Sequence, residues 1–267
     1  MLEEADNILD GMEVIMEQLG LEDAYIGIEE NKMDAIKYLD KCIAERGVAG
    51  RINTFKLLSR YPKGAERVMV YEITGTTMNA GVLPADLGII LTNVTTVAKL
   101  GQYLKDGIPL TTKRVTVDGS AVNTPKNVIV PIGTPIKDVI EFCGGYSQDA
   151  VKIIMGGPMM GKTVFSDDMQ IMKNTNALLV FGQEEAVLPK ETACIGCGRC
   201  TVACPFNLMP AALANAYDAR DAEKLDALRV MQCMEFGSCS YICPARRPLA
   251  FINKLGKSVV KEAQNGK

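Results

Sequence analysis

The stretch Cys194-Ile-Gly-Cys197-Gly-Arg-Cys200-Thr-Val-Ala-Cys204-Pro205 decides how the last third of this chain folds. Its spacing, C-x2-C-x2-C-x3-C-P, is that of a loop that holds an iron–sulfur cluster. Soft thiolate sulfur suits iron, and this spacing wraps three thiolates around one cluster. Glycines between the cysteines let the backbone approach inorganic sulfide closely. The run therefore predicts a protein that moves electrons.

A second copy of the run contains Cys233, Cys239 and Cys243, followed by Pro244. Phe236 stands where its second cysteine is expected, and a phenylalanine side chain cannot ligate iron. In two-cluster ferredoxins the fourth cysteine of each run ligates the other cluster. Carried over, this rule gives cluster I the ligands Cys194, Cys197, Cys200 and Cys243, and it gives cluster II the ligands Cys204, Cys233 and Cys239.

Phe236 leaves three outcomes open for cluster II: a [3Fe-4S] cluster, an incomplete [4Fe-4S] cluster with a ligand other than cysteine, or no stable cluster. We expect a three-iron or labile site. For the first run, a zinc site is the alternative, but spacings of two, two and three crowd a tetrahedral ion, so we expect one [4Fe-4S] cluster. Cys42 and Cys143 lie at apolar helical positions and are predicted to be core residues.

Composition excludes several classes of protein. The 267 residues include no histidine, which removes Ser-His and Cys-His catalysis and histidine-ligated metals. A net charge of −3 argues against a nucleic-acid partner. Seven of the nine cysteines stand at metal spacing, which is typical of a reducing cytoplasmic location. No apolar stretch approaches the roughly 18 residues that span a bilayer, so any membrane role would be peripheral.

Strands and helices alternate before the cysteine region and predict an α/β layer with a partly parallel sheet. Residues 2–21, closed by Gly20, residues 34–44 and residues 94–104 have helical periodicity. The ranges that resemble strands are 24–28, 51–58 and 68–73, and residues 87–91 are apolar enough to be buried.

A small β unit is expected next, over residues 112–182. Its predicted strands are 114–117, 127–131, 151–155 and 177–181, with a helix over 136–143. The polar segment 183–192 is the expected domain boundary, and residues 190–250 form the cysteine domain. Within that domain, residues 209–230 have a helical pattern. The lysine-rich residues 251–267 are predicted to be a solvated basic tail.

Residues 156–163, Gly-Gly-Pro-Met-Met-Gly-Lys-Thr, match the nucleotide-binding expression G-x4-G-K-[ST]. A phosphate-binding loop of this kind must open a helix. Residues 164–168 lack helical periodicity, so we favour a tight glycine turn between small strands over nucleotide hydrolysis.

Several segments together make the chain resemble the C subunit of the Rnf complex, a membrane-bound ferredoxin:NAD oxidoreductase that couples electron transfer to sodium or proton movement. The resemblance covers essentially the whole chain. It is carried by the cysteine runs and by residues 25–32, 61–66, 81–86 and 156–161.

The resemblance implies that residues 1–110 are the later part of a flavin-binding domain like that of the NADH-binding subunit of complex I. It also implies a β-grasp SLBB unit and a bacterial-type ferredoxin module. The family's FMN contacts correspond to Tyr61, Gly64, Glu66, Asn93 and Thr96. Read alone, these residues suit ordinary turn and helix-cap chemistry.

The resemblance further implies FMN and NAD as cofactors of the complex, other Rnf subunits and ferredoxin or an iron–sulfur subunit as partners, and a peripheral location on the inner face of the membrane. The family's upstream glycine-rich loop is absent, which suggests an N-terminally truncated relative with an incomplete FMN and NADH site. A cobalamin reductase of the same general plan, or a non-catalytic scaffold that bears a cluster, are the alternatives.

Overall fold

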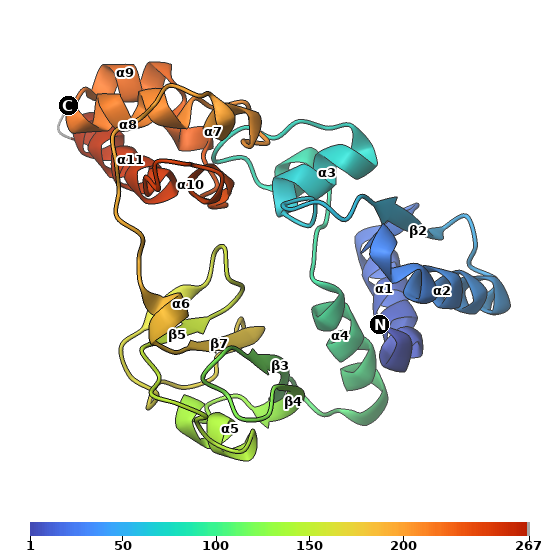
Figure 1. The fold of residues 1–267 in the computed structure, drawn as a ribbon. Coiled ribbons are helices and arrows are strands. Elements are labelled where there is room, and N and C mark those ends of the chain that lie inside the picture. Colours follow the sequence, from blue (N-terminus) through green and yellow to red (C-terminus); the bar gives the residue numbers. More distant parts are fainter. Residues whose placement is uncertain (266–267) are drawn as a thin grey trace. The chain divides into compact units, whose positions relative to one another are not determined.

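A computed structural model describes residues 1–265 and divides the chain into two compact units, one formed by residues 1–110 and one that begins at Thr111 (Figure 1). Helices and strands mix in both units, and each unit has a hydrophobic core of its own. The expected α/β fold class is confirmed. Over the described residues, the structure contains no helix long and apolar enough to cross a membrane.

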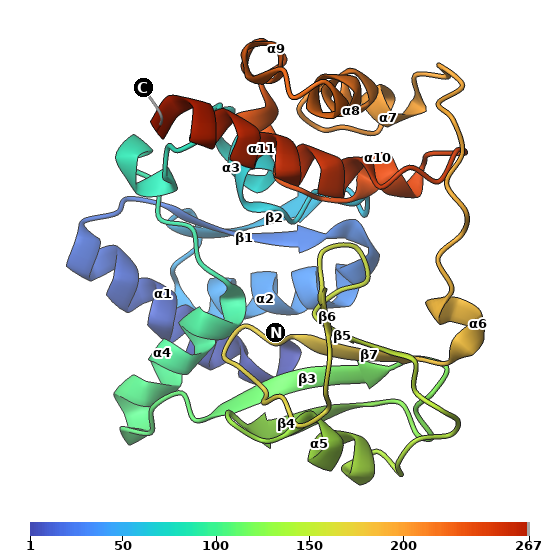
Figure 2. The same cartoon turned by 90° about the vertical axis from the view of Figure 1, so that its left-hand side faces the viewer.

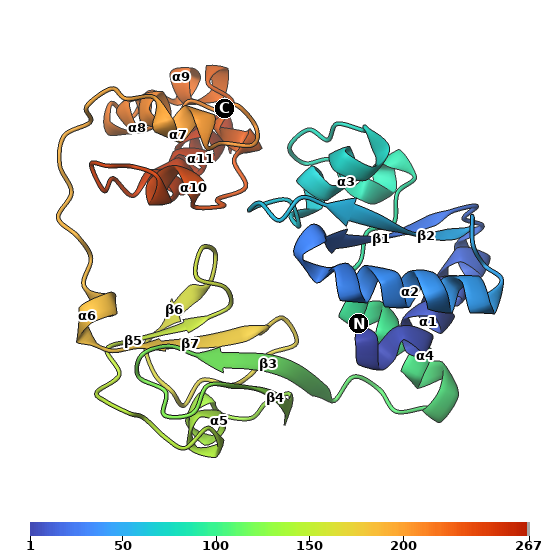
Figure 3. The same cartoon turned by 45° about the vertical axis from the view of Figure 1, so that its right-hand side comes forward.

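The first unit places helices on both faces of a two-stranded parallel sheet. Strand β1 (Ala24–Glu29) pairs with β2 (Ile52–Leu57), and Ala24 lies opposite Ile52. Helix α2 (Met33–Arg46) connects the strands, and α3 (Glu66–Thr74) follows them. Figures 2 and 3 show α2 and α3 on opposite faces of this sheet. Helices α1 (Ala5–Leu19) and α4 (Val94–Asp106) complete the unit.

Two glycines bring α1 and α4 into backbone contact. A Cβ atom at Gly101 would lie 2.0 Å from the carbonyl oxygen of Asn7, and one at Gly11 would lie 2.2 Å from that of Val97. Both distances are far below van der Waals contact, so the two helices can lie this close together only with glycine at these positions. The pair seals one side of a core that contains Ile8, Leu9, Met16, Ile26, Ile28, Ile36, Leu39, Ile43 and Ile52.

Two predictions for the first unit are wrong. Residues 68–73, expected to form a strand, lie in helix α3, which ends at Gly75 with φ of 70°. Their β-branched residues favour strands, but Val68 and Val70 are buried by packing, which overrides that local preference. Residues 87–91, expected to be buried, include the exposed side chains of Leu87 and Ile90.

The second unit begins with a five-stranded β-grasp sheet in the order β4-β3-β7-β5-β6. The strands are β3 (Thr112–Asp118), β4 (Lys126–Pro131), β5 (Lys152–Met155), β6 (Lys162–Val164) and β7 (Ala177–Phe181). Helix α5 (Ile136–Phe142) contributes Ile136, Val139 and Ile140 to the core beneath the sheet. The buried Cys143 belongs to that core as predicted, and Cys42 packs against the core of the first unit.

The nucleotide-binding expression falls on the turn of a β-hairpin. Strands β5 and β6 pair antiparallel, with Met155 opposite Lys162, and residues 156–161 connect them. The Gly161 N–H donates to the carbonyl oxygen of Gly157 at 2.7 Å, which closes the turn. A strand follows the turn where a phosphate-binding loop needs a helix, so the prediction of a tight glycine turn is confirmed.

The cysteine region folds as a small helical module. After α6 (Gln183–Ala186) come α7 (Arg199–Val202), α8 (Pro210–Asp218), α9 (Ala222–Ala227), α10 (Ser238–Tyr241) and α11 (Leu249–Asn265). The helix expected over 209–230 is interrupted between α8 and α9. There Arg220 has φ of 55°, and the Asp221 carboxylate accepts a hydrogen bond from the Lys224 N–H.

The prediction of a solvated basic tail is also wrong. Residues 251–265 lie in α11, which packs against α8 and α9, and the last two residues of the tail lie outside the described part. Asn253, Gly256 and Val260 are buried on one side of this helix, whereas Lys254 and Lys261 are exposed. Because lysines dominate the composition of this segment, its composition alone did not indicate an amphipathic helix.

Replacing Gly101 with alanine should destabilise the first unit. Alanine gains about 1 kcal/mol of helix propensity, but the overlap with Asn7 must push α1 and α4 apart. We expect a net loss of roughly 1–3 kcal/mol in the free energy of unfolding, measured by urea titration. Gly64→Ala is the matched control, because open space surrounds Gly64. Equal stability of the two variants would contradict the packing account.

Candidate functional site

The two cysteine loops have the same local geometry. Helices α7 and α10 each follow a glycine with positive φ, 71° at Gly198 and 81° at Gly237. After the last cysteine of each run, Asn207 and Arg246 also adopt left-handed backbone, with φ of 52° and 55°. Each run therefore folds as one turn of helix between two left-handed residues, which bends the chain around a pocket.

The first pocket gathers all four cysteines that were predicted to hold cluster I. Its volume is about 140 Å³, and Cys194, Cys197, Cys200 and Cys243 line it. Cys194 and Cys197 are exposed, Cys243 is half-buried and Cys200 is buried. The donor set fits an iron–sulfur cluster, because four thiolates on one pocket supply one ligand to each of four irons. Three of the four come from one loop, and Cys243 comes from the other.

The second pocket gathers the three cysteines predicted for cluster II. Cys204, Cys233 and Cys239 line it together with Phe236, but its volume is only about 20 Å³, room for about one water molecule. Phe236 is buried and stacks on Phe206, with ring centroids 5.8 Å apart. Phe236 thus stands at the position of the missing fourth cysteine, and Phe206 packs against its ring.

Cys239 is a weaker acid than an ordinary thiol. Burial, and then the neighbouring Cys233 and Cys204, raise the pKa of Cys239 to about 12. Without a metal this thiol keeps its proton at neutral pH, so binding of iron must displace that proton. Among residues 1–265 no three cysteine or acidic side chains converge closely enough to hold a single metal ion. The ligand assignment therefore rests on the sequence spacing and on the lining of the two pockets.

The two pockets differ in charge. Arg247 lines the first, whereas the apolar Leu208 occupies the matching place in the second. The Arg247 side chain is largely buried, and its Nε donates to Glu191 Oε1 at 3.2 Å. Its Nη2 lies 3.7 Å from Asp218 Oδ2. A cation is thus held beside the first pocket by two carboxylates.

The predicted flavin contacts lie at the starts of two helices of the first unit. Tyr61 and Gly64 belong to the segment between β2 and α3, and Glu66 is the first residue of α3. Asn93 caps α4, where its Oδ1 accepts a hydrogen bond from the Thr95 N–H at 2.9 Å. Thr96 lies in the first turn of the same helix. Burial raises the pKa of the Tyr61 phenol. Helix capping accounts for Asn93 without a flavin.

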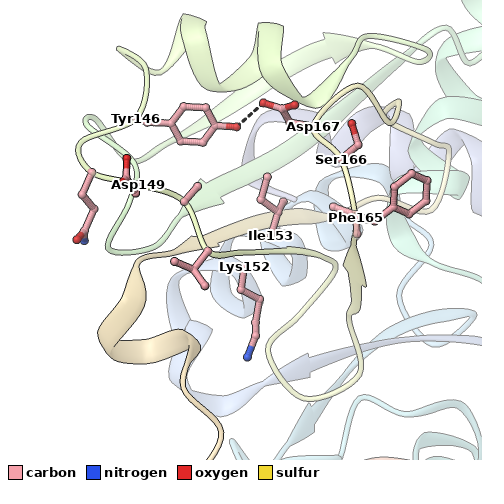
Figure 4. A pocket seen from close by; sticks show the side chains of 11 residues that line it. Tyr146, Asp149, Lys152, Ile153, Phe165, Ser166 and Asp167 are labelled. Carbon is pink, nitrogen blue, oxygen red and sulfur yellow. Dashed lines mark hydrogen bonds between the residues drawn. The ribbon is translucent and has the colours of Figure 1, made fainter.

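A third pocket, of about 390 Å³, opens on the β-grasp sheet and was not predicted (Figure 4). The Tyr146 hydroxyl donates to Asp167 Oδ2 at 2.7 Å. Burial, and then this hydrogen bond, raise the pKa of Tyr146. Phe165, on the same rim, is 94% exposed. The polar rim and the exposed rings of Tyr146 and Phe165 do not define a reaction.

Two residues next to the cysteine pockets were missed from the sequence. Arg247 lines the first pocket, and Asn253, from α11, lines the second. A signal existed for Asn253, because it stands four residues after Leu249 and seven before Val260, on the apolar stripe of a helix. A polar residue at such a position indicates a partner inside the fold.

Three family descriptions match the chain in succession. The Nuo51 FMN-binding domain matches residues 1–102, the SLBB domain matches 114–163, and the 4Fe-4S dicluster domain matches 186–244.

Curated relatives match over most or all of the chain. The C subunit of the sodium-translocating ferredoxin:NAD(+) oxidoreductase complex of Acetobacterium woodii is 37% identical over the whole chain, which covers 60% of that protein. The proton-translocating counterpart of Clostridium ljungdahlii is 40% identical over 80% of the chain and 46% of its own length. The C subunit of the ion-translocating oxidoreductase complex of Rhodobacter capsulatus is 34% identical over the whole chain and 51% of its own length. The chain thus spans about half the length of these relatives.

Solved structures share the fold. The NAD+-reducing [NiFe]-hydrogenase in its H2-reduced state aligns over 97% of the chain and 50% of its own, with a TM-score of 0.60 and 12% identity. The air-oxidised state gives a TM-score of 0.59 at 15% identity, over 97% of the chain and 52% of its own.

Proposed function

The chain is homologous to the C subunit of the ion-translocating ferredoxin:NAD(+) oxidoreductase complexes, and we propose that it carries electrons within such a complex. The observation that supports this most directly is the first pocket, which brings together Cys194, Cys197, Cys200 and Cys243. The chain would lie at the inner face of the membrane, and membrane subunits of the complex would perform the ion movement. Exchange of electrons with ferredoxin and NAD belongs, in this proposal, to the complex as a whole.

The first pocket is the proposed site of a [4Fe-4S] cluster. Such a cluster accepts and releases one electron at a time. The chain supplies the four thiolates, and Gly196 and Gly198 keep the loop backbone close to the sulfides. Two exposed ligands, Cys194 and Cys197, place one edge of the pocket at the surface, where a redox partner can approach.

The second pocket is the proposed site of a three-iron cluster. Cys204, Cys233 and Cys239 provide three thiolates, and a [3Fe-4S] core needs one for each iron. Phe236 and Phe206 fill the remaining corner with apolar surface, which keeps water from serving as a fourth ligand. The loops must move apart to admit the core, because the pocket holds only about 20 Å³.

A flavin is proposed for the first unit, which matches the Nuo51 FMN-binding domain. Tyr61, Gly64 and Glu66 would contact the flavin from the segment before α3. Asn93 and Thr96 would contact it from the start of α4, where the positive end of the helix dipole attracts phosphate. These contacts rest on correspondence with the family.

Iron content tests the cluster assignments. After anaerobic reconstitution of the full chain with iron and sulfide, we expect about seven irons per chain, from one four-iron and one three-iron cluster. Phe236→Cys should raise this to about eight and replace the three-iron electron paramagnetic resonance (EPR) signal by a second four-iron signal. Fewer than about four irons in the unmodified chain would refute the proposed function.

Flavin binding tests the first unit. Tyr61→Ala should weaken FMN binding about tenfold in a flavin fluorescence titration, because one aromatic contact contributes roughly 0.5–1.5 kcal/mol. Tyr103→Ala, at an exposed tyrosine of α4, is the control and should bind FMN normally. If the unmodified chain binds no FMN while cluster I is intact, a cluster-bearing scaffold becomes the better account.

The charge beside the first pocket should set the potential of cluster I. Arg247→Gln removes the cation and should lower the midpoint potential, by about 59 mV for each tenfold change in a one-electron equilibrium. Glu191→Gln removes a negative charge near the same site and should raise it. An EPR-monitored redox titration measures both, with cluster II as internal reference. Shifts of the same sign in both variants would indicate a structural role for Arg247.

A further inference from the structure

Asn253 is a polar residue in the middle of an apolar contact. It lies on the side of α11 that also buries Leu249, Gly256 and Val260, and only 1% of its surface is exposed. A helix that only had to pack at this position would gain more from leucine, because burying an amide without full hydrogen bonding costs roughly 1–3 kcal/mol. Packing alone therefore gives no reason for an asparagine.

The side chain of Asn253 faces the second cysteine pocket. It lines that pocket with Cys204, Cys233 and Cys239, and its Nδ2 lies 3.8 Å from Cys233 Sγ, within hydrogen-bonding distance for sulfur. Its Oδ1 is buried and has no hydrogen-bond partner. Ser238 Oγ, on the same pocket, is also buried without a partner. Two unsatisfied polar atoms thus meet at one small pocket of three thiols.

A bound cluster would strengthen the hydrogen bond that the Asn253 amide N–H donates to Cys233 Sγ. A neutral thiol is a weak hydrogen-bond acceptor, whereas a thiolate on iron is a charged one. The Glu235 N–H already donates to Cys233 Sγ at 3.4 Å, so the amide of Asn253 would be its second donor. Lys257 of α11 also holds the Glu235 carboxylate at 2.8 Å, which fixes the Cys233 loop to the same helix.

We propose that Asn253 is a positioning residue of cluster II, whose amide N–H donates to the Cys233 thiolate and stabilises the cluster that three cysteines hold. The proposal rests on the cluster proposed for the second pocket. Hydrogen bonds to cluster sulfur favour the more negative, reduced state and orient the ligand. Asn253 thereby offsets part of what is lost where Phe236 replaces a fourth cysteine.

Asn253→Leu separates this role from a structural one. Leucine keeps a similar volume and removes the donor. In the full chain, reconstituted anaerobically with iron and sulfide, the variant should lose cluster II to a chelator about tenfold faster and lower its midpoint potential. The metal-free variant should unfold in urea at the same or a higher midpoint, because no buried amide is left unsatisfied. Asn215→Leu, at an exposed asparagine of α8, is the control.

The possible results distinguish a role of Asn253 at cluster II from a role in the fold. Two clusters in the unmodified chain with unchanged cluster II in Asn253→Leu would overturn the role of Asn253 and leave the clusters standing. A lower unfolding midpoint with unchanged potential would show that the amide serves the fold. One cluster in the unmodified chain would overturn both this inference and the proposed cluster II. If the leucine variant does not fold, Asn253→Asp decides, because a carboxylate should repel the thiolates and lower the potential further.

Discussion

Exchange of the fourth cysteine between the two loops is the constraint on which the helical module depends. Cys243 joins the pocket of the first loop, and Cys204 joins the pocket of the second. Neither loop lines its pocket with its own cysteines alone, so the helices between them must hold both runs together. Helix α11 does much of this, because it packs on α8 and α9 and contributes residues to the second pocket.

The two pockets share a backbone plan but differ in chemistry. Around the first, Arg247 adds a positive charge, and Cys194 and Cys197 lie at the surface. Around the second, Phe236, Phe206 and Leu208 make an apolar wall, and Asn253 supplies a buried polar group. Repetition of the sequence motif thus conceals a difference in charge and polarity between the two pockets.

Spacing predicted the cysteine pockets because the geometry of a ligand loop is local. The order of the cysteines and glycines defines each loop, and the two-cluster rule gave the exchange of Cys204 and Cys243 between the loops. Other features depend on packing between distant segments. The stacking of Phe206 on Phe236 joins two loops, and the buried position of Asn253 required knowing that the lysine-rich end forms a helix. Helix α3 was missed for the same reason, since its valines are buried by contacts that no local pattern records.

We propose that the helical module holds one four-iron and one three-iron cluster, and Mössbauer spectroscopy tests this proposal most directly. The full chain would be reconstituted anaerobically with isotopically labelled iron. The account predicts two sets of signals, one from a four-iron and one from a three-iron cluster, with intensities near a ratio of about four to three. A single four-iron set, or two equal four-iron sets, would contradict it.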